Sequence, residues 1–142
     1  MSGLSMFFAE QVEKEKVMEY VASKRFTDEK GSPAKWLIGC VNGAVDEALR
    51  KECTRKVPIP GKKNAYVPET DYEAYLGKLA ARCIQFPDLN NVELQNSYGV
   101  MGADVLLKTM LKPGEYQDLL KKVQEANSFD TTLEEEVEEA KN

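Results

Sequence analysis

Histidine is absent from this sequence of 142 residues, and cysteine is scarce. Without histidine the chain has no base for a Ser-His-Asp or Cys-His nucleophilic site, and it lacks the commonest ligand of transition metals. Its three cysteines, Cys40, Cys53 and Cys83, are odd in number and widely spaced, whereas a zinc site needs four suitable ligands. We therefore predict reduced, buried thiols and no catalytic, cofactor or metal site.

Long hydrophobic runs are also lacking. No apolar stretch approaches the length of a bilayer span, and the first residues show no basic region followed by an apolar stretch and a cleavage site. The composition, 42% hydrophobic and 30% charged, is ordinary for a folded globular protein, and 142 residues is the length of one domain. We expect a single cytoplasmic domain without a membrane partner.

Charge is distributed unevenly along the chain. The net charge of −5 resides in residues 130–142, where six carboxylates accompany one lysine, so the remainder is neutral overall. Within that remainder, residues 50–63 hold six cations against one glutamate. Two interpretations of this basic segment stay open: a solvated or protein-binding face, or a set of phosphate contacts for nucleic acid. The acidic overall charge and the absence of zinc-finger, RRM and KH signatures favour the first.

The most persistent helical spacing of apolar residues lies between Thr70 and Asn127, and it predicts a bundle of short helices. The Thr70 hydroxyl and the Glu73 side chain are placed to form a capping box at the start of the first helix. Later boundaries carry their own signals, which are prolines, an asparagine cap and glycine stops. The expected helices are bounded by these residues: Thr70 and Phe86, Asn91 and Tyr98, Gly102 and Leu111, Pro113 and Asn127.

The N-terminal half has the composition of strands. Residues 17–26 and 35–41 alternate imperfectly between apolar and polar side chains, and the turn-forming residues between them predict an antiparallel hairpin. Asn42 is placed to cap a helix that begins near Gly43. We expect this helix to cover one face of the hairpin, because a lone hairpin is not stable in water.

Prolines and a glycine crowd residues 57–69, and they predict an extended linker between the two halves. The fold class that we expect is α+β, with a small N-terminal antiparallel β-hairpin element and a mainly α-helical C-terminal half. The single domain, residues 1–142, is then divided as follows: β-hairpin plus helix in 1–56, linker in 57–69, helical bundle in 70–127, and an acidic C-terminal helix or tail in 128–142.

Apolar side chains recur at helical spacing near both ends of the chain. The first twelve residues include two adjacent phenylalanines, which are costly to leave in water and must dock either on the protein's own core or on a partner. Near the other end, two apolar residues are interleaved with glutamates, and two interpretations stay open: a solvated acidic face, or a thin amphipathic helix that binds a basic or helical partner. The candidate partner-binding residues are Leu4, Phe7, Phe8, Val12, Leu133 and Val137.

A set of short runs extends over essentially the whole chain and is densest in its helical half. These runs are Phe7–Ala9, Lys24–Phe26, Leu49–Lys51, Thr54–Lys56, Glu69–Leu76, Phe86–Leu89, Leu94–Ala103, Lys112–Tyr116 and Val123–Asp130. Together they resemble the tail assembly chaperones of PBSX-like phages and prophages, the XkdN-like family. The resemblance rests on the ensemble of runs, since no single run is specific for a chemistry.

The resemblance implies a non-enzymatic role in building a phage tail tube. Such a protein is expected to bind the tape measure protein in the bacterial host cytoplasm, to promote assembly of the tail tube protein around it, and to be absent from the mature particle. A second copy of the chain is a further expected partner, whereas nucleic acid is not. Two rival functions stay open: a nucleic-acid-binding phage regulator that uses residues 50–63, and a structural component retained in the tail.

Overall fold

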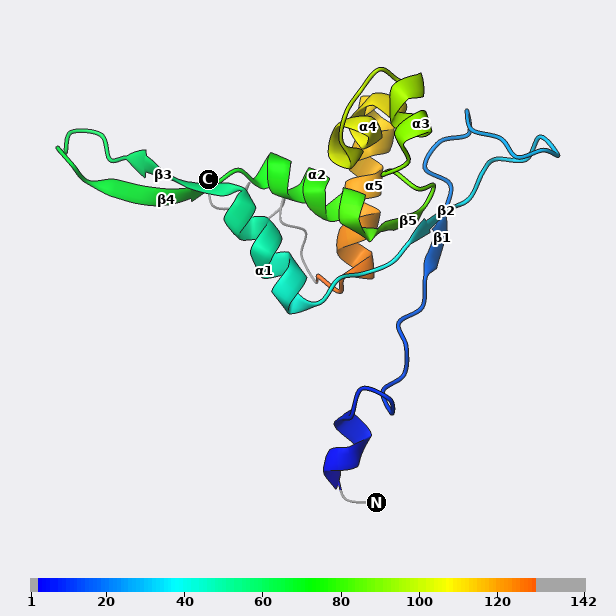
Figure 1. Ribbon diagram of the computed structural model, residues 1–142, viewed down its shortest axis with the longest axis horizontal. Coiled ribbons are helices and arrows are strands. Elements are labelled where there is room, and N and C mark those ends of the chain that lie inside the picture. Colours follow the sequence, from blue (N-terminus) through cyan, green and yellow to red (C-terminus); the bar gives the residue numbers. More distant parts are fainter. Residues whose placement is uncertain (1–2, 130–142) are drawn as a thin grey trace.

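The computed structural model describes residues 3–129, in which short strands alternate with helices and the α+β class is confirmed (Figure 1). In chain order the elements are η1 (Gly3–Phe7), β1 (Met18–Tyr20), β2 (Trp36–Ile38), α1 (Gly43–Glu52), β3 (Thr54–Pro58), β4 (Tyr66–Thr70), α2 (Tyr72–Cys83), β5 (Ile84–Phe86), α3 (Val92–Ser97), α4 (Ala103–Met110) and α5 (Pro113–Ala126). Within the described residues, no helix is both long and apolar enough to cross a bilayer.

The predicted antiparallel pairing of the two N-terminal strands is confirmed, although the strands are short. β1 pairs with β2 through Met18 and Ile38, and β2 also pairs with β5, so the sheet has the order β1-β2-β5. The sequence did not indicate β5, because its residues continue the apolar spacing of the preceding helix. In the structure α2 ends at Cys83, whose carbonyl accepts a hydrogen bond from the Gly39 N–H at 2.8 Å, and Ile84 pairs with Ile38.

A single hydrophobic core joins the sheet to the helices. Trp36 and Ile38 of β2 are 1% and 0% exposed, and they belong to the same buried cluster as side chains of α1, α2, α4 and α5. Prominent members from these helices are Leu49, Tyr75, Leu79, Leu106, Leu107, Leu119 and Val123. The N-terminal strands are therefore part of the helical body rather than a separate half.

Most of the predicted helix boundaries are confirmed by their caps. The Asn42 and Asn91 side chains accept hydrogen bonds from backbone N–H groups at the starts of α1 and α3, and Pro113 is the first residue of α5. The first turn of α2 differs from the prediction. Its cap is Asp71, whose carboxylate accepts from the Ala74 N–H at 3.1 Å, because the Thr70 hydroxyl is bonded instead to the Thr54 hydroxyl at 2.7 Å.

Residues 57–69 are not the predicted linker, because most of them belong to a second antiparallel hairpin. β3 and β4 pair along their whole length, from Thr54 opposite Thr70 to Pro58 opposite Tyr66. Figure 1 shows this hairpin projecting from the body, beyond the C-terminal end of α1.

The expected position of α1 is also wrong, since α1 packs against α2 rather than over the β1–β2 hairpin.

Candidate protein-binding surfaces

The N-terminal arm, residues 3–16, places its apolar side chains in solvent. η1 contains no buried residue, and Leu4, Phe7, Phe8 and Val12 are 67%, 75%, 47% and 59% exposed. Figure 1 shows η1 standing away from the body, joined to β1 by an extended segment. In the structure these rings lie outside the buried cluster of the body, and their role in binding a partner stays a prediction.

The second predicted contact face is not tested in the same way. Leu133 and Val137 lie outside the described residues, which end at Phe129. Their role therefore stays a prediction from the sequence. The structure does place the end of α5, which precedes these residues, because the Asn127 carboxamide oxygen accepts a hydrogen bond from the Val41 N–H at 3.0 Å.

A groove of about 1030 Å³ lies where the base of the β3–β4 hairpin meets α2, α4 and α5. Buried apolar side chains of Cys53, Leu76 and Leu120 contribute to its lining. Charges of both signs surround them: Glu52, Arg55, Glu69, Asp71, Glu73, Lys78 and Lys108. An apolar floor with a mixed-charge rim is typical of a surface that contacts a polypeptide. The sequence did not indicate this groove because one wall is the hairpin that was interpreted as a linker.

Close packing between α2 and α5 forms part of the same region. Gly77 is buried in α2, and a Cβ atom added there would lie 2.9 Å from the Tyr116 hydroxyl oxygen. Such a distance is shorter than real Cβ contacts, so any larger residue at this position would have to displace the tyrosine. Gly77 therefore leaves room for the end of the Tyr116 side chain where α2 meets α5.

A half-buried polar cluster of Asp46, Arg50 and Tyr75 connects α1 with α2. The Tyr75 hydroxyl donates a hydrogen bond to Asp46, the Arg50 Nε donates to the other Asp46 oxygen at 3.0 Å, and the Arg50 guanidinium lies 4.5 Å from the centre of the Tyr75 ring. Burial, followed by the hydrogen bond to Asp46, raises the pKa of Tyr75. A phenol held neutral in this way, with both oxygens of its carboxylate partner engaged, stabilises a helix contact and is not set up as an acid or base.

The basic segment 50–63 is divided between two structural roles. Arg50 belongs to the half-buried cluster, and Lys51 forms an exposed ion pair with Glu47 on the same helix at 3.4 Å. The other four cations, Arg55, Lys56, Lys62 and Lys63, lie on the β3–β4 hairpin and its connecting loop. Four of the six cations of the segment therefore belong to the hairpin.

The cysteines have the character expected of structural thiols. Cys53 and Cys83 are buried, Cys40 is half-buried, and all three are free. Burial raises the pKa of the Cys53 and Cys83 thiols, which lowers their reactivity as nucleophiles. In the part of the chain that the structure describes, no three His, Cys, Asp or Glu side chains are arranged to hold a metal ion.

Comparison with known proteins identifies related chains along almost the full length. The chain is 29% identical to the uncharacterized protein YqbN of Bacillus subtilis (strain 168) and 28% identical to the phage-like element PBSX protein XkdN of the same organism. Each alignment spans 140 residues, covering 98% of this chain and 93% of the relative. The crystal structure of YqbN superposes with a TM-score of 0.77 at 25% identity, over 92% of this chain and 99% of that chain.

The family model described as phage XkdN-like tail assembly chaperone protein matches residues 4–141, which includes the N-terminal arm, the hairpin and every helix of the body. The two relatives share that length, and the solved relative shares the fold. The chain belongs to the phage XkdN-like tail assembly chaperone family.

Proposed function

We propose that this protein is a non-enzymatic chaperone that binds the tape measure protein and promotes assembly of the tail tube protein around it. Family membership supports the general role in tail assembly. The observation that carries the specific proposal is the exposed N-terminal arm, whose Phe7 and Phe8 rings project from a body that is complete without them. Adjacent exposed aromatic rings act as anchors for an apolar partner surface.

The arm suits a long helical partner for physical reasons. Leu4 and Phe7 lie three residues apart in its 3₁₀ helix and so share one side, and Phe8 follows directly. The extended segment before β1 lets the arm reach away from the body. Apolar side chains of this kind bind an amphipathic helix by covering its exposed apolar stripe. Covering that stripe keeps the helix soluble until tube subunits replace the chaperone.

The test is capture of the tape measure protein of the same phage or prophage during co-expression. Changing Phe7→Ser and Phe8→Ser together is expected to reduce the captured amount at least tenfold, since two anchor rings of roughly 1–2 kcal/mol each are lost. The far-ultraviolet circular dichroism spectrum is expected to stay unchanged, because neither ring contacts the core.

A matched control replaces exposed apolar residues elsewhere on the body. Val92 and Met101 are 67% and 89% exposed, so Val92→Ser with Met101→Ser removes a similar apolar area from a different place. Equal capture by the arm variant and the wild type would refute the proposed role of the arm. Loss of helical signal in the arm variant would show that the rings belong to the core in solution.

We further propose that the protein acts in the bacterial host cytoplasm and leaves before the tail is complete. A chaperone that shields a partner's apolar surface must be displaced when the tube covers that surface. Mass spectrometry of purified particles is expected to detect the tube and tape measure proteins but not this chain. Its detection at a fixed ratio to the tube protein would instead support the rival role of a structural tail component.

A further inference from the structure

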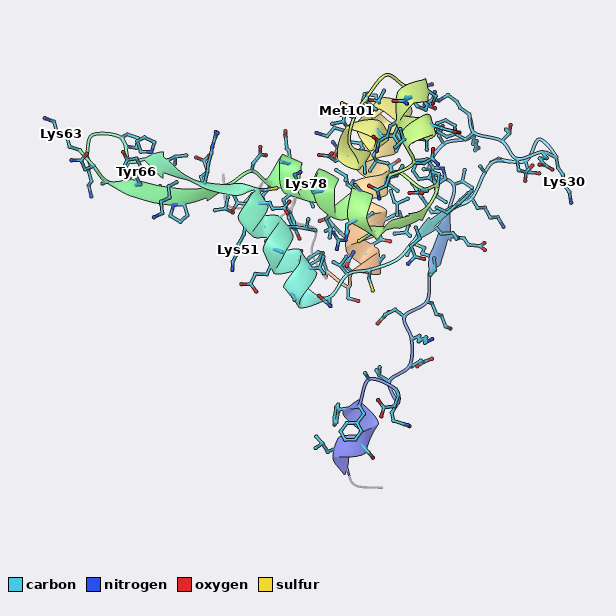
Figure 2. All side chains as sticks on the ribbon, viewed as in Figure 1. Lys30, Lys51, Lys63, Tyr66, Lys78 and Met101 are labelled. Atoms are coloured by element: carbon cyan, nitrogen blue, oxygen red, sulfur yellow. The ribbon has the colours of Figure 1, made fainter. Side chains whose placement is uncertain are left out.

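The β3–β4 hairpin carries its positive charge on one face and at its tip. Strand residues alternate between faces, and directly opposed residues share a face, so Lys56, Pro58, Tyr66 and Pro68 lie together. Lys62 and Lys63 occupy the connecting loop. Figure 2 shows Lys63 at the tip of the hairpin and Tyr66 on the strand behind it. We call Lys56, Tyr66, Lys62 and Lys63 the cationic hairpin face.

The opposite side of the hairpin is electrically balanced. There Arg55 is paired in register with Glu69, the only carboxylate among residues 54–70. The cationic hairpin face therefore has no acidic residue of its own. Across residues 3–129, neither Lys56, Lys62 nor Lys63 lies in an ion pair. An exposed aromatic ring next to three lysines is suited to an acidic peptide that also carries apolar side chains.

The same chain contains a segment with that chemistry. Residues 130–142 combine six carboxylates and one lysine with Leu133 and Val137, and they account for the whole net charge of −5. The segment 130–142 and the cationic hairpin face thus have opposite charge, and both also carry apolar groups. Residues 1–53 and 71–129 carry 14 cations and 17 carboxylates, a net charge of −3, so the hairpin is the part of the chain whose net charge is opposite to that of the segment.

The position of Asn127 brings this segment within reach of the hairpin. Asn127 is bonded to Val41, two residues before α1, and α1 then leads to the hairpin base (Figure 1). A helix of that length spans about 15 Å, and the six residues of chain that flank it between Val41 and Lys56 add at most about 20 Å, so Lys56 lies within about 35 Å of Asn127. Glu139 follows Asn127 by twelve residues and can extend to about 40 Å from it. The glutamates of the segment can therefore meet Lys56.

We propose that the cationic hairpin face is a binding site for an acidic peptide, and that its occupant is residues 130–142 of the same chain. Attachment to α5 gives the acidic segment an effective concentration near the millimolar range, which lets even weak ion pairs keep the face covered. Because these charges are exposed, the contact weakens as salt shortens the Debye length from about 10 Å at 0.1 M to about 3 Å at 1 M. This inference concerns the chain alone and does not depend on the tape measure proposal.

Zero-length carbodiimide cross-linking of the full chain tests the contact directly, because it couples only carboxylates and amines that touch. At low salt, cross-links are expected between Lys56, Lys62 or Lys63 and the glutamates of residues 130–142. Lys30 serves as the internal control, since it is exposed and lies on the opposite side of the body from the hairpin (Figure 2). Absence of hairpin cross-links, or equal cross-linking of Lys30, would overturn the proposal.

The same cross-linking on a mixture of isotope-labelled and unlabelled protein shows whether the acidic segment on the hairpin comes from the same chain or from another copy. If the segment binds its own chain, cross-linked peptide pairs are expected to come from a single isotope composition. Pairs of mixed composition would assign the occupant to a second copy, which overturns the intrachain proposal and points to a dimer exchanging acidic segments.

A second, independent test measures how tightly the protein binds a single-stranded oligonucleotide, a polyanion that competes with the acidic segment for the cationic hairpin face. Replacing the glutamates of residues 130–142 by glutamine removes this competition, so the affinity for the oligonucleotide at low salt is expected to rise about two- to tenfold. The matched control makes the same change in net charge at exposed carboxylates elsewhere: Glu10→Gln, Glu13→Gln, Glu15→Gln, Glu29→Gln and Glu93→Gln. An equal rise in both variants, or no rise in either, would contradict a covered face. Strong binding by the unchanged protein would identify the face as an open nucleic-acid site.

Discussion

Among single residues, Tyr75 links α2 to α1 through contacts with two charged side chains. Its ring is 0% exposed, its hydroxyl donates to Asp46, and the guanidinium of Arg50 lies against its ring. Tyr75 lies in the first of the helices that the apolar spacing predicted, and this helix is confirmed as α2. The sequence did not reveal the partners, because Asp46 and Arg50 belong to a different helix and their spacing alone predicts only an exposed ion pair on α1.

Removing the Tyr75 hydroxyl is expected to destabilise the protein. In Tyr75→Phe the Asp46 carboxylate loses a hydrogen bond, so the free energy of unfolding at neutral pH is expected to fall by about 1.5–3 kcal/mol. Urea denaturation followed by circular dichroism measures the change. Tyr98→Phe is the control, since Tyr98 is 37% exposed, and its free energy of unfolding is expected to change by less than about 0.5 kcal/mol.

The same variant is expected to change how stability depends on alkaline pH. Folding raises the pKa of Tyr75 above its ordinary value of 10.0, so its contribution to stability is full below pH 10 and is lost as the pH rises toward the folded-state pKa. The wild type should therefore lose stability above pH 10 more steeply than Tyr75→Phe. Parallel pH profiles for the two proteins would show that the phenol is not held neutral by its surroundings.

The cap of α2 shows why a local sequence rule can select the neighbouring residue. Thr70 and Asp71 are both good caps, and the capping-box pattern favoured Thr70. In the structure Thr70 ends β4, where its hydroxyl bonds across the hairpin to Thr54, and Asp71 takes over as cap. The choice depends on a strand that the sequence did not indicate.

At the scale of elements, the start of α2 can be tested by comparing two acidic residues. Asp71→Ala removes the cap and is expected to lower the free energy of unfolding by about 1 kcal/mol. Glu73→Ala is expected to cost less than about 0.5 kcal/mol, because Glu73 is exposed and does not close the predicted capping box. Equal costs measured by thermal or urea unfolding would show that the predicted box forms in solution.

The β3–β4 hairpin was missed because its prolines were interpreted as signs of a linker. Pro58 is the last residue of β3 and Pro68 lies in the middle of β4, where a proline in a central strand would remove a hydrogen bond of the ladder. In a ribbon of two strands both strands are edges, and a proline there is tolerated. Proline content therefore could not distinguish a linker from an isolated hairpin, whereas the Asn42 and Asn91 caps depend only on neighbouring residues and were predicted correctly.

For the whole molecule, the main observation is that one core joins the N-terminal strands to the helices. Trp36 of β2 packs in the same cluster as the helices, and Arg25, in the segment between β1 and β2, donates to the Met110 carbonyl oxygen at 2.7 Å. Periodicity within each segment predicted which helical faces are buried. It could not predict that the short strands would be buried by those same faces, because that is decided by contacts between residues far apart in sequence.

A shared core also predicts that the body unfolds in a single step. Trp36 is the chain's one tryptophan and is 1% exposed, so its fluorescence reports on the sheet, whereas circular dichroism at 222 nm reports mainly on the helices. The two signals are expected to follow the same urea transition, with one midpoint and one slope. Deleting residues 1–16 is expected to leave this midpoint within error, because η1 buries no residue and Val12 is exposed. If Trp36 became exposed at lower urea than the helices melt, the strands would form an independent unit, and the single core described above would not hold the body together in solution.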